Sequence, residues 1–170
     1  MKYQTKMLTG RDRESLPELV GTLRTRLEEI APLYGGRDVE RALRTHTLRN
    51  VSREVEKNNP IYRYVGCFDN KKPIGMLVET DLVEEEKGKY HLDFNHLCWM
   101  VAKESGKGVG SCLVDDCLER SRKMDVDYVT LDVAEKNAGA RRLYEKKGFV
   151  YAPVQHLQDE GVLVMGYKIR

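Results

Sequence analysis

The sequence predicts a mixed fold of helices and strands, α+β (α/β). One mixed central β-sheet of about six to seven strands is expected to be flanked by about four helices. Two helix-like segments precede three consecutive strand-like segments, and strand and helix patterns then alternate up to the C-terminus. The expected order is therefore β-α-α-β-β-β-α-β-α-β-β. A chain of 170 residues, of which 41% are hydrophobic and 33% charged, fits a single domain over residues 1–170.

The first third of the chain is expected to hold a short strand at 3–8 and two helices. Asp12 offers an N-cap for the first helix, whose apolar residues recur at helical spacing until Pro32. A second helix is expected over 37–57, because apolar residues continue at that spacing until an Asn-Asn-Pro run.

The remaining elements follow in chain order. Strands rich in β-branched and aromatic residues are predicted at 61–68, 74–81 and 90–101, separated by turns at 69–73 and 84–89. A helix at 108–123, a strand at 127–133, a helix at 138–147 and strands at 149–152 and 162–169 complete the chain.

Composition excludes several classes of function. A formal net charge of +2 gives no strong field for nucleic acid or a membrane surface, so we expect neither as a partner. No apolar run is long enough for a signal peptide or a membrane span. The four cysteines form no C-x-x-C pair and the four histidines no metal-binding motif, which indicates free thiols, a cytoplasmic protein and no metal site.

A glycine-rich turn, with Gly106, Gly108 and Gly110, joins the strand at 90–101 to the next helix. Without Cβ atoms the backbone N–H groups can approach a ligand closely, and the positive end of a helix favours phosphate. Lys107 could add a charge to the same group. The turn matches neither the P-loop nor the dinucleotide-binding fingerprint. Taken alone, it is either a phosphate site or a turn that lets a helix pack tightly on a strand.

A second group of residues lies in the helix at 138–147 and its flanks. Asn137 is a good N-cap, and Gly148 is typical of the residue that follows a helix. Leu143 and Tyr144 lie on one helical face together with Ala140. On its own, this pattern also describes a short helix with a tyrosine at the edge of the core.

Together the two segments resemble the Gcn5-related N-acetyltransferase (GNAT) superfamily. Residues 105–110, Ser-Gly-Lys-Gly-Val-Gly, are similar to the family's pyrophosphate motif R/Q-x-x-G-x-G/A, and residues 137–149 match N-x-x-A-x-x-L/F-Y-x-x-x-G-F. Ser105 stands where the family usually has Arg or Gln, and Ala102 replaces a frequent proline.

The resemblance implies that acetyl-CoA is the cofactor and that a core of about 90–150 binds it. The pantetheine arm would pair with the strand end formed by Trp99, Met100 and Val101, and would contact Asn137. The pyrophosphate would lie on the turn formed by Ser105, Gly106, Lys107, Gly108, Val109, Gly110 and Ser111.

The implied reaction is direct attack of a primary amine on the thioester through a tetrahedral intermediate, whose oxyanion a backbone N–H of the strand end would stabilise. Tyr144 is the expected general acid, because a phenol is protonated at neutral pH. Glu79, Asp93 and His96 are the candidates for the general base. Strand alternation puts Asp93 and His96 on opposite faces unless a bulge intervenes.

Several acceptors remain open, and a small-molecule amine is favoured. The alternatives are a protein amine (a lysine or an N-terminus), an aminoacyl-tRNA, or no acceptor at all in a non-catalytic acyl-CoA-binding module. Asp159 and Glu160 could attract a cationic amine or simply face solvent, and the arginines of the helix at 37–57 could contact an acidic acceptor or RNA or equally face solvent. The protein is expected to be a monomer or a homodimer.

Overall fold

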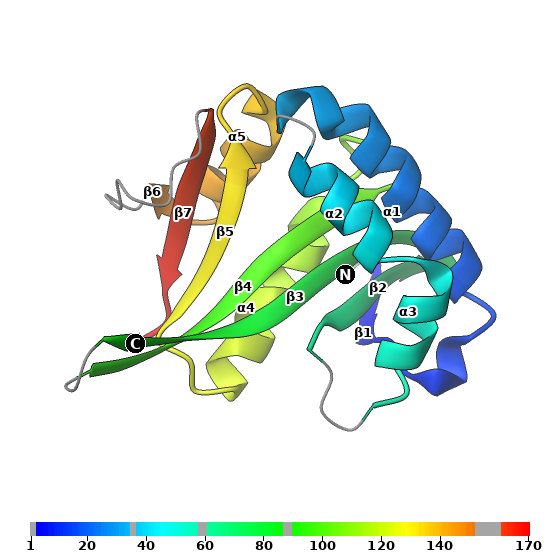
Figure 1. Ribbon diagram of the computed structural model, residues 1–170, viewed down its shortest axis with the longest axis horizontal. Coiled ribbons are helices and arrows are strands. Elements are labelled where there is room, and N and C mark those ends of the chain that lie inside the picture. The colour runs from blue at the N-terminus through cyan, green and yellow to red at the C-terminus, as the bar shows by residue number, and fades with distance from the viewer. Residues whose placement is uncertain (1–2, 35–36, 58–60, 87–89, 152–160) are drawn as a thin grey trace.

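The computed structural model describes residues 3–34, 37–57, 61–86, 90–151 and 161–170. For residues 37–38, 82–86 and 90–93 the backbone alone is described. One β-sheet crosses the molecule and carries helices on both faces (Figure 1).

The sheet has seven strands in the order β1-β2-β3-β4-β5-β7-β6. The strands are β1 (Gln4–Met7), β2 (Arg63–Asp69), β3 (Lys72–Glu86), β4 (Tyr90–Ala102), β5 (Tyr128–Ala134), β6 (Val150–Tyr151) and β7 (Val162–Lys168). All neighbouring strands are antiparallel except β4 and β5, which are parallel. This mixed sheet confirms the predicted fold class.

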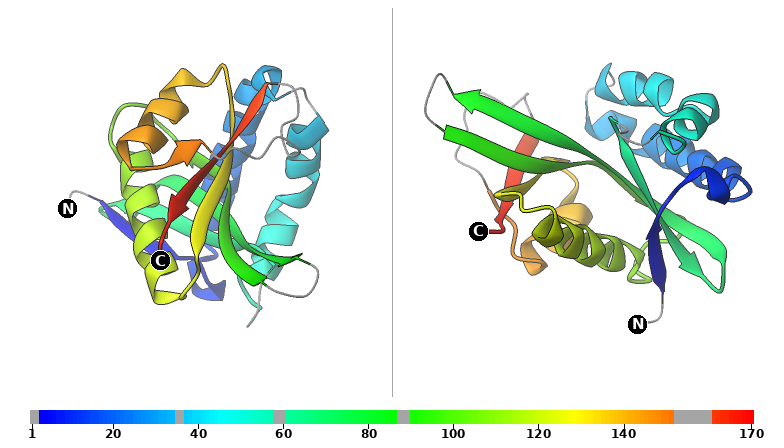
Figure 2. Two further views of the ribbon diagram at one scale, coloured as in Figure 1. Left: turned by 90° about the vertical axis from the view of Figure 1, so that its left-hand side faces the viewer. Right: turned by 90° about the horizontal axis from the view of Figure 1, so that it is seen from below.

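The helices divide between the two faces of the sheet. They are α1 (Leu16–Ile30), α2 (Arg37–Thr45), α3 (Leu48–Glu54), α4 (Val109–Lys123) and α5 (Ala138–Lys146), with short 3-10 helices η1 (Gly10–Asp12) and η2 (Ala31–Leu33). Figure 2 shows α1, α2 and α3 on one side of the sheet and α4 and α5 on the other. The sheet is therefore the middle layer of three.

The first helix begins differently from the prediction. Thr9 caps η1, and the Asp12 Oδ2 atom accepts a hydrogen bond from the Thr9 N–H at 2.9 Å, which completes a capping box. Helix α1 starts only at Leu16, after Ser15, whose side chain makes no capping hydrogen bond. Asp12 therefore stabilises a short helix ahead of α1 and does not cap α1 itself.

The single helix predicted at 37–57 is wrong, because Thr47 divides it into α2 and α3. The backbone of Thr47 is extended, with φ −72° and ψ 155°, and its hydroxyl accepts a hydrogen bond from the Asn50 N–H at 3.3 Å. Such a residue caps a new helix and cannot lie inside a continuous one. The preceding His46 is buried, and its Nδ1 atom lies 2.9 Å from the Tyr64 hydroxyl of β2.

The hairpin of β2 and β3 has a tighter turn than the predicted 69–73. Asn70 and Lys71 both have positive φ, 48° and 71°, as a two-residue type I′ turn requires. At its other end β3 continues to Glu86, which pairs with Tyr90 of β4. The glutamates expected in a turn at 84–89 therefore belong to the strand as far as residue 86.

The alternation of side chains along the strands creates two hydrophobic cores. One lies under α4 and α5 and contains Leu77, Leu97 and Leu131 from the sheet. The other lies under α1, α2 and α3 and contains Met76 and Val78. Neighbouring residues on one strand thus belong to different layers of the molecule.

Strands β4 and β5 separate after a short parallel ladder. Their last pair is Leu97 with Leu131, although β4 continues to Ala102 and β5 to Ala134 (Figure 1). We call the diverging segments, 98–102 and 132–134, the fork. Beyond the last pair, the edge of β4 that faces β5 has no strand partner among the described residues.

A β-bulge in β4 lies at the start of the fork. Val78 of β3 pairs with Trp99 and Glu79 pairs with Leu97, which leaves Cys98 as the extra residue. Cys98 and Trp99 both pack toward the core under α1–α3. The bulge thus changes the direction of β4 where it leaves β5.

Candidate active site

The glycine-rich turn leads from β4 into α4. Gly106 and Gly108 have φ values of 75° and 86°, a left-handed conformation that costs an L-residue roughly 1 kcal/mol or more. A Cβ atom at either position would meet no atom within 4 Å, so the space above the turn is open. The first helical hydrogen bond of α4 runs from the Cys112 N–H to the Gly108 carbonyl at 3.0 Å, which leaves the N–H groups of residues 109–111 for an anion.

A cavity of about 520 Å³ joins the two segments that the sequence singled out. Three elements line it, the end of β4, the glycine-rich turn and the first half of α5. The lining residues are Met100, Val101, Ala102, Glu104, Ser105, Gly106, Gly108, Val109, Gly110, Ser111, Asn137, Gly139, Ala140, Arg142 and Leu143. Of the residues predicted to bind the cofactor, Trp99, Lys107 and Tyr144 lie outside this lining.

Gly110 lets α4 approach both neighbouring elements. A Cβ atom there would lie 3.1 Å from the Leu143 Cδ2 atom and 3.4 Å from the Met100 Cε atom. The Leu143 side chain would have to shift by a few tenths of an ångström to make room for it. Gly110 thus lets the side chains of Leu143 and Met100 pack close to the start of α4.

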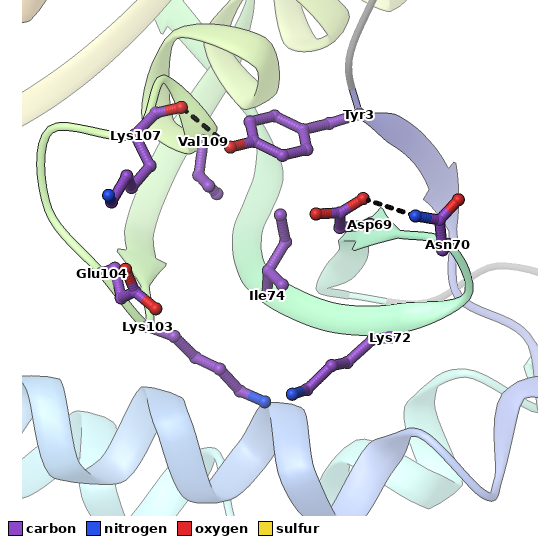
Figure 3. Close-up of a pocket in the computed structure, with 9 residues that line it drawn as sticks. All are labelled: Tyr3, Asp69, Asn70, Lys72, Ile74, Lys103, Glu104, Lys107 and Val109. Atoms are coloured by element: carbon purple, nitrogen blue, oxygen red, sulfur yellow. Dashed lines mark hydrogen bonds between the residues drawn. The ribbon is translucent and has the colours of Figure 1, made fainter.

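Lys107 lines a second cavity, of about 560 Å³, beside the turn (Figure 3). Two more lysines, Lys72 and Lys103, line this cavity, and the Tyr3 hydroxyl donates a hydrogen bond to the Lys107 carbonyl at 3.0 Å. The Lys103 ammonium pairs with Glu18 of α1. The structure therefore places Lys107 apart from the cavity that the two motifs share.

Asn137 caps α5 at the edge of the shared cavity. Its Oδ1 atom accepts a hydrogen bond from the Ala140 N–H at 3.2 Å, which confirms the predicted N-cap. Gly148, with φ 91°, follows the helix as predicted for its C-terminal side. The carbonyl oxygen of the Asn137 side chain holds the cap, and the same side chain also interacts with Tyr34.

Tyr144 lies in the core under α4 and α5 and is only 6% exposed. Its ring packs against Phe149, with centroids 5.7 Å apart. Burial raises the pKa of Tyr144 well above its usual value, and the nearby Tyr34 and Cys117 raise it further. Within the described residues its hydroxyl has no hydrogen-bond partner, yet it is not among the polar atoms sealed from solvent. Burial therefore keeps the phenol protonated at neutral pH.

Trp99 lies at the fork on the side of α1–α3. Its ring meets that of Tyr34 edge to face, with centroids 6.0 Å apart. Burial raises the pKa of Tyr34, while the Ala134 backbone and the Asn137 side chain lower it and Asp132 raises it. Tyr34, just after η2, thus reaches across the fork to both β4 and β5.

Glu79, a predicted candidate for the base, is fully buried among charges on the α4 side of the sheet. Its Oε1 atom lies 3.1 Å from the Arg63 Nε atom and also pairs with Arg120 of α4. Its other oxygen accepts from the Asn95 amide at 3.3 Å. With two guanidinium groups on one carboxylate, this placement argues against Glu79 as the base.

Asp93 and His96 lie on a regular stretch of β4. Residues 90–97 pair one to one with 79–86 of β3, and the bulge at Cys98 comes after them. No bulge therefore brings Asp93 and His96 to the same face, and the side chain of Asp93 lies outside the described residues.

His96 reaches β5 beside the last strand pair. Its Nδ1 atom lies 3.0 Å from the Thr130 Oγ1 atom, and its Nε2 atom lies 3.9 Å from the Asp132 Oδ2 atom. Burial lowers the pKa of His96, and the Asp132 carboxylate opposes that shift. Of the three predicted base candidates, His96 is the one whose described side chain lies at the fork.

Sequence reasoning missed Thr130 and Asp132. Both occupy alternate positions of the strand predicted at 127–133, so their shared face was readable. What the sequence does not state is the parallel register, in which His96 pairs with Thr130.

Several other features bear on function. Arg44 of α2 is exposed and pairs with Glu40 at 2.9 Å, one turn away. Asp159 and Glu160 lie outside the described residues.

In the part of the chain that the structure describes, no group of three or more His, Cys, Asp or Glu side chains could hold a metal ion, and no helix is long and apolar enough to cross a bilayer.

The turn at the start of α4, with its N–H groups at a helix N-terminus, suits a ligand that carries phosphate. The family model of the acetyltransferase (GNAT) family matches residues 24–149, well over half of the chain. The protein therefore belongs to the GNAT family. Membership implies acetyl-CoA-dependent acyltransferase activity.

Solved structures share this fold over nearly their full length. PaiA N-acetyltransferase from Thermoplasma acidophilum, in complex with coenzyme A, is 18% identical with a TM-score of 0.72, covering 99% of each chain. Arabidopsis thaliana NAA60 in complex with acetyl-CoA is 15% identical with a TM-score of 0.62, covering 98% of each chain. A chain of the NatC complex bound to Gag peptide and CoA is 16% identical with a TM-score of 0.65, covering 100% of each chain. No curated protein matches the chain in sequence.

Proposed function

We propose that this protein is an N-acetyltransferase that moves an acetyl group from acetyl-CoA to the primary amine of a small molecule. The observation that carries the proposal is the single cavity lined by the end of β4, the glycine-rich turn and the start of α5. A fork in the sheet opens beside this cavity, where an acceptor and the acetyl group would meet.

The residues fit acetyl-CoA in shape and in hydrogen-bonding groups. The open space above Gly106 and Gly108, with the N–H groups of residues 109–111, suits the pyrophosphate. The Asn137 amide and the unpaired edge of β4 suit the amide groups of the pantetheine arm. Bound there, acetyl-CoA supplies the acetyl group as a reactive thioester.

Two groups of the protein would then stabilise the negative charges that develop on the thioester oxygen and on the leaving sulfur. A backbone N–H within 99–101, on the edge that has left β5, would donate a hydrogen bond to the oxygen that becomes negative. The Tyr144 hydroxyl, kept protonated by burial, would give its proton to the leaving sulfur and regain one from the nitrogen that becomes an amide. These roles need no covalent link between enzyme and substrate.

Calorimetry with acetyl-CoA tests the cofactor half of the proposal. We expect binding by the native protein and a loss of at least about tenfold in affinity for Gly108→Val, whose side chain would strain the turn and fill the space above it. Gly21→Ala is the matched control, because a Cβ atom at this site in α1 meets no atom within 4 Å. Absence of binding by the native protein would refute the proposal.

An assay of thiol release tests the reaction and its acceptor. The protein is supplied with acetyl-CoA and, separately, with pooled small amines, peptides and charged tRNA. Turnover with small amines is the expected outcome, and turnover only with peptides or charged tRNA would assign one of those acceptors. Binding without turnover on any pool would identify a non-catalytic module. The four free thiols support a reducing compartment such as the cytoplasm as the place of action.

A further inference from the structure

Two side chains from the N-terminal part of the protein contact the backbone on either side of the glycines in the glycine-rich turn. Arg26 of α1 contacts the segment that enters the turn, at the end of β4. Tyr3, which precedes β1, contacts the turn at the carbonyl of Lys107 (Figure 3). The turn is thus linked to two elements that belong to neither of the two motifs.

Arg26 binds two consecutive carbonyl groups at the end of β4. Its Nε atom donates a hydrogen bond to the Ala102 carbonyl at 3.0 Å, and its Nη2 atom donates another to the Lys103 carbonyl. The third nitrogen, Nη1, pairs with Glu29, one turn later on α1, at 2.5 Å. A planar guanidinium with all three nitrogens engaged has little freedom left, so the two carbonyls are fixed relative to α1.

Lys103, at the entrance to the turn, is held at three points. Its N–H donates to the Ile74 carbonyl of β3 at 2.9 Å, its own carbonyl accepts from Arg26, and its ammonium group pairs with Glu18 of α1. On the far side of the turn, Val109 is buried and belongs to the core under α4 and α5. The turn therefore spans two fixed points.

Between those points the turn has few constraints of its own. In the described part of the chain, no backbone–backbone hydrogen bond of standard geometry involves residues 104–107. Ser105, which stands where the GNAT family usually has Arg or Gln, makes no side-chain hydrogen bond to another described residue. The Tyr3 hydroxyl, which donates to the Lys107 carbonyl at 3.0 Å, is thus the group among the described residues that fixes this segment by a hydrogen bond.

The glycines make such outside support important for binding. Gly106 and Gly108 have access to many conformations, and Cβ atoms on them would meet no atom within 4 Å, so packing does not restrict them on that side. A turn that is already ordered when the ligand arrives avoids the entropy cost of ordering during binding, and this difference appears as affinity.

We propose that Arg26 and Tyr3 are positioning residues, which keep the glycine-rich turn in the shape that accepts the pyrophosphate of acetyl-CoA. The inference rests on the proposed function and names residues that set the affinity for the donor. Neither side chain lines the cavity shared by β4, the turn and α5, so both act through the backbone that they contact. Tyr3 also precedes residues 24–149, the part of the chain that the family model matches.

Calorimetry with acetyl-CoA tests Arg26 against a matched arginine of the same helix. Arg26→Met keeps the alkyl stem and removes the hydrogen-bond donors, and should weaken binding by about tenfold. Arg24→Met is the control, because Arg24 donates to the Leu43 carbonyl of α2 at 3.1 Å and not to the turn. Both variants should lower the midpoint of urea unfolding, but the affinity of Arg24→Met should stay within about twofold of native. Arg26→Lys, whose ammonium group can still bond to a carbonyl, should recover part of the affinity.

Tyr3→Phe tests the other contact, because it removes one hydroxyl and keeps the ring that packs on the core under α4 and α5. Acetyl-CoA should bind about threefold more weakly, and KM for acetyl-CoA should rise by the same factor while kcat stays constant, because the turn holds the donor equally in the ground state and the transition state. Tyr167→Phe is the control, since this phenol packs against the same core and its hydroxyl bonds to Arg122. Native affinity in both Tyr3→Phe and Arg26→Met, or equal losses of affinity in Arg24→Met and Arg26→Met, would overturn the inference and leave the proposed function intact.

NMR relaxation of the backbone amides tests the support of the turn without any ligand. In the free protein, the order parameters of the Gly106 and Gly108 amides should fall in Arg26→Met and in Tyr3→Phe, and should keep their native values in Arg24→Met. If the native protein does not bind acetyl-CoA, the proposed function fails, and these order parameters still decide whether the two side chains order the turn. Native order parameters in both Arg26→Met and Tyr3→Phe would overturn the inference.

Discussion

His46 and Tyr64 form a hydrogen bond inside the core, with 2.9 Å between the Nδ1 atom and the phenol oxygen, although both residues are at least 98% buried. This bond connects the segment between α2 and α3 to strand β2. Burial lowers the pKa of His46 from 6.5 to about 4, so the folded protein holds this imidazole neutral.

Acid should therefore destabilise the protein through His46. The unfolded chain takes up the proton below pH 6.5, while the folded chain resists it down to about 4, so stability is complete above pH 6.5 and is lost as pH falls between these values. The expected loss is about 1.4 kcal/mol per pH unit, measured by urea unfolding at about pH 7.5, 6 and 5. His46→Gln should show a shallower dependence, and an identical dependence in both proteins would contradict this assignment.

Glu79→Gln should damage stability more than catalysis. The change leaves the guanidinium groups of Arg63 and Arg120 without their shared buried carboxylate, at a cost of about 3–5 kcal/mol in the free energy of unfolding. The pH–rate profile of the folded fraction should keep its acidic limb. The control is Glu119→Gln. Glu119 is an exposed partner of Lys123 on α4, the helix that carries Arg120, and its replacement should change the free energy of unfolding by less than about 0.5 kcal/mol. Loss of the acidic limb in Glu79→Gln would restore Glu79 as the base.

Asn137 should prove to have two separable roles. Asn137→Ala removes both the cap of α5 and the amide in the cavity, so the free energy of unfolding should fall by about 1 kcal/mol and acetyl-CoA should bind about three- to tenfold more weakly. Asn137→Ser keeps a capping oxygen, and should recover the stability but not the affinity. Chemical unfolding and calorimetry measure the two effects. If serine restores the affinity as well, the amide does not contact the cofactor.

Tyr144→Phe should lower kcat by about a hundredfold or more with little change in acetyl-CoA affinity, because it removes the proposed proton donor and keeps the ring that packs on Phe149. Tyr167→Phe is the control, since this phenol lies in the same core layer and accepts a hydrogen bond from Arg122 at 3.2 Å. Steady-state thiol release and calorimetry give the two quantities. An unchanged kcat would remove Tyr144 from the mechanism.

Local patterns made much of the fold and one half of the site predictable. Strand and helix periods differ, and closely spaced glycines are unfavourable inside either element, so the turn at 106–110 and the helix after Asn137 could be located from the sequence. The division of the helix at 37–57 was missed because Val39, Leu43, Val51 and Val55 keep helical spacing across it. The cap at Thr47 divides the helix, and the contact of the preceding His46 with Tyr64 of β2 holds this break against the sheet.

The base could not be chosen from the sequence, because the choice depends on partners that are distant in the chain. Glu79 is engaged by Arg120, 41 residues away, and His96 is engaged by Thr130, 34 residues away. Strand alternation gives the face of a residue but not the register of a parallel pair. The partners of each candidate base were therefore visible only in three dimensions.

The two hydrophobic cores lie on opposite faces of the sheet, one beneath α4 and α5 and the other beneath α1, α2 and α3. Substitutions in one layer are separated from the other by the backbone of the strands, so their effects on stability should be nearly additive. Under the proposed function, substitutions in the layer of α1–α3 would alter the surroundings of the acceptor and leave the half that would hold acetyl-CoA unchanged. The same separation gives protein engineers a surface on which to select new amine specificities without rebuilding the donor site.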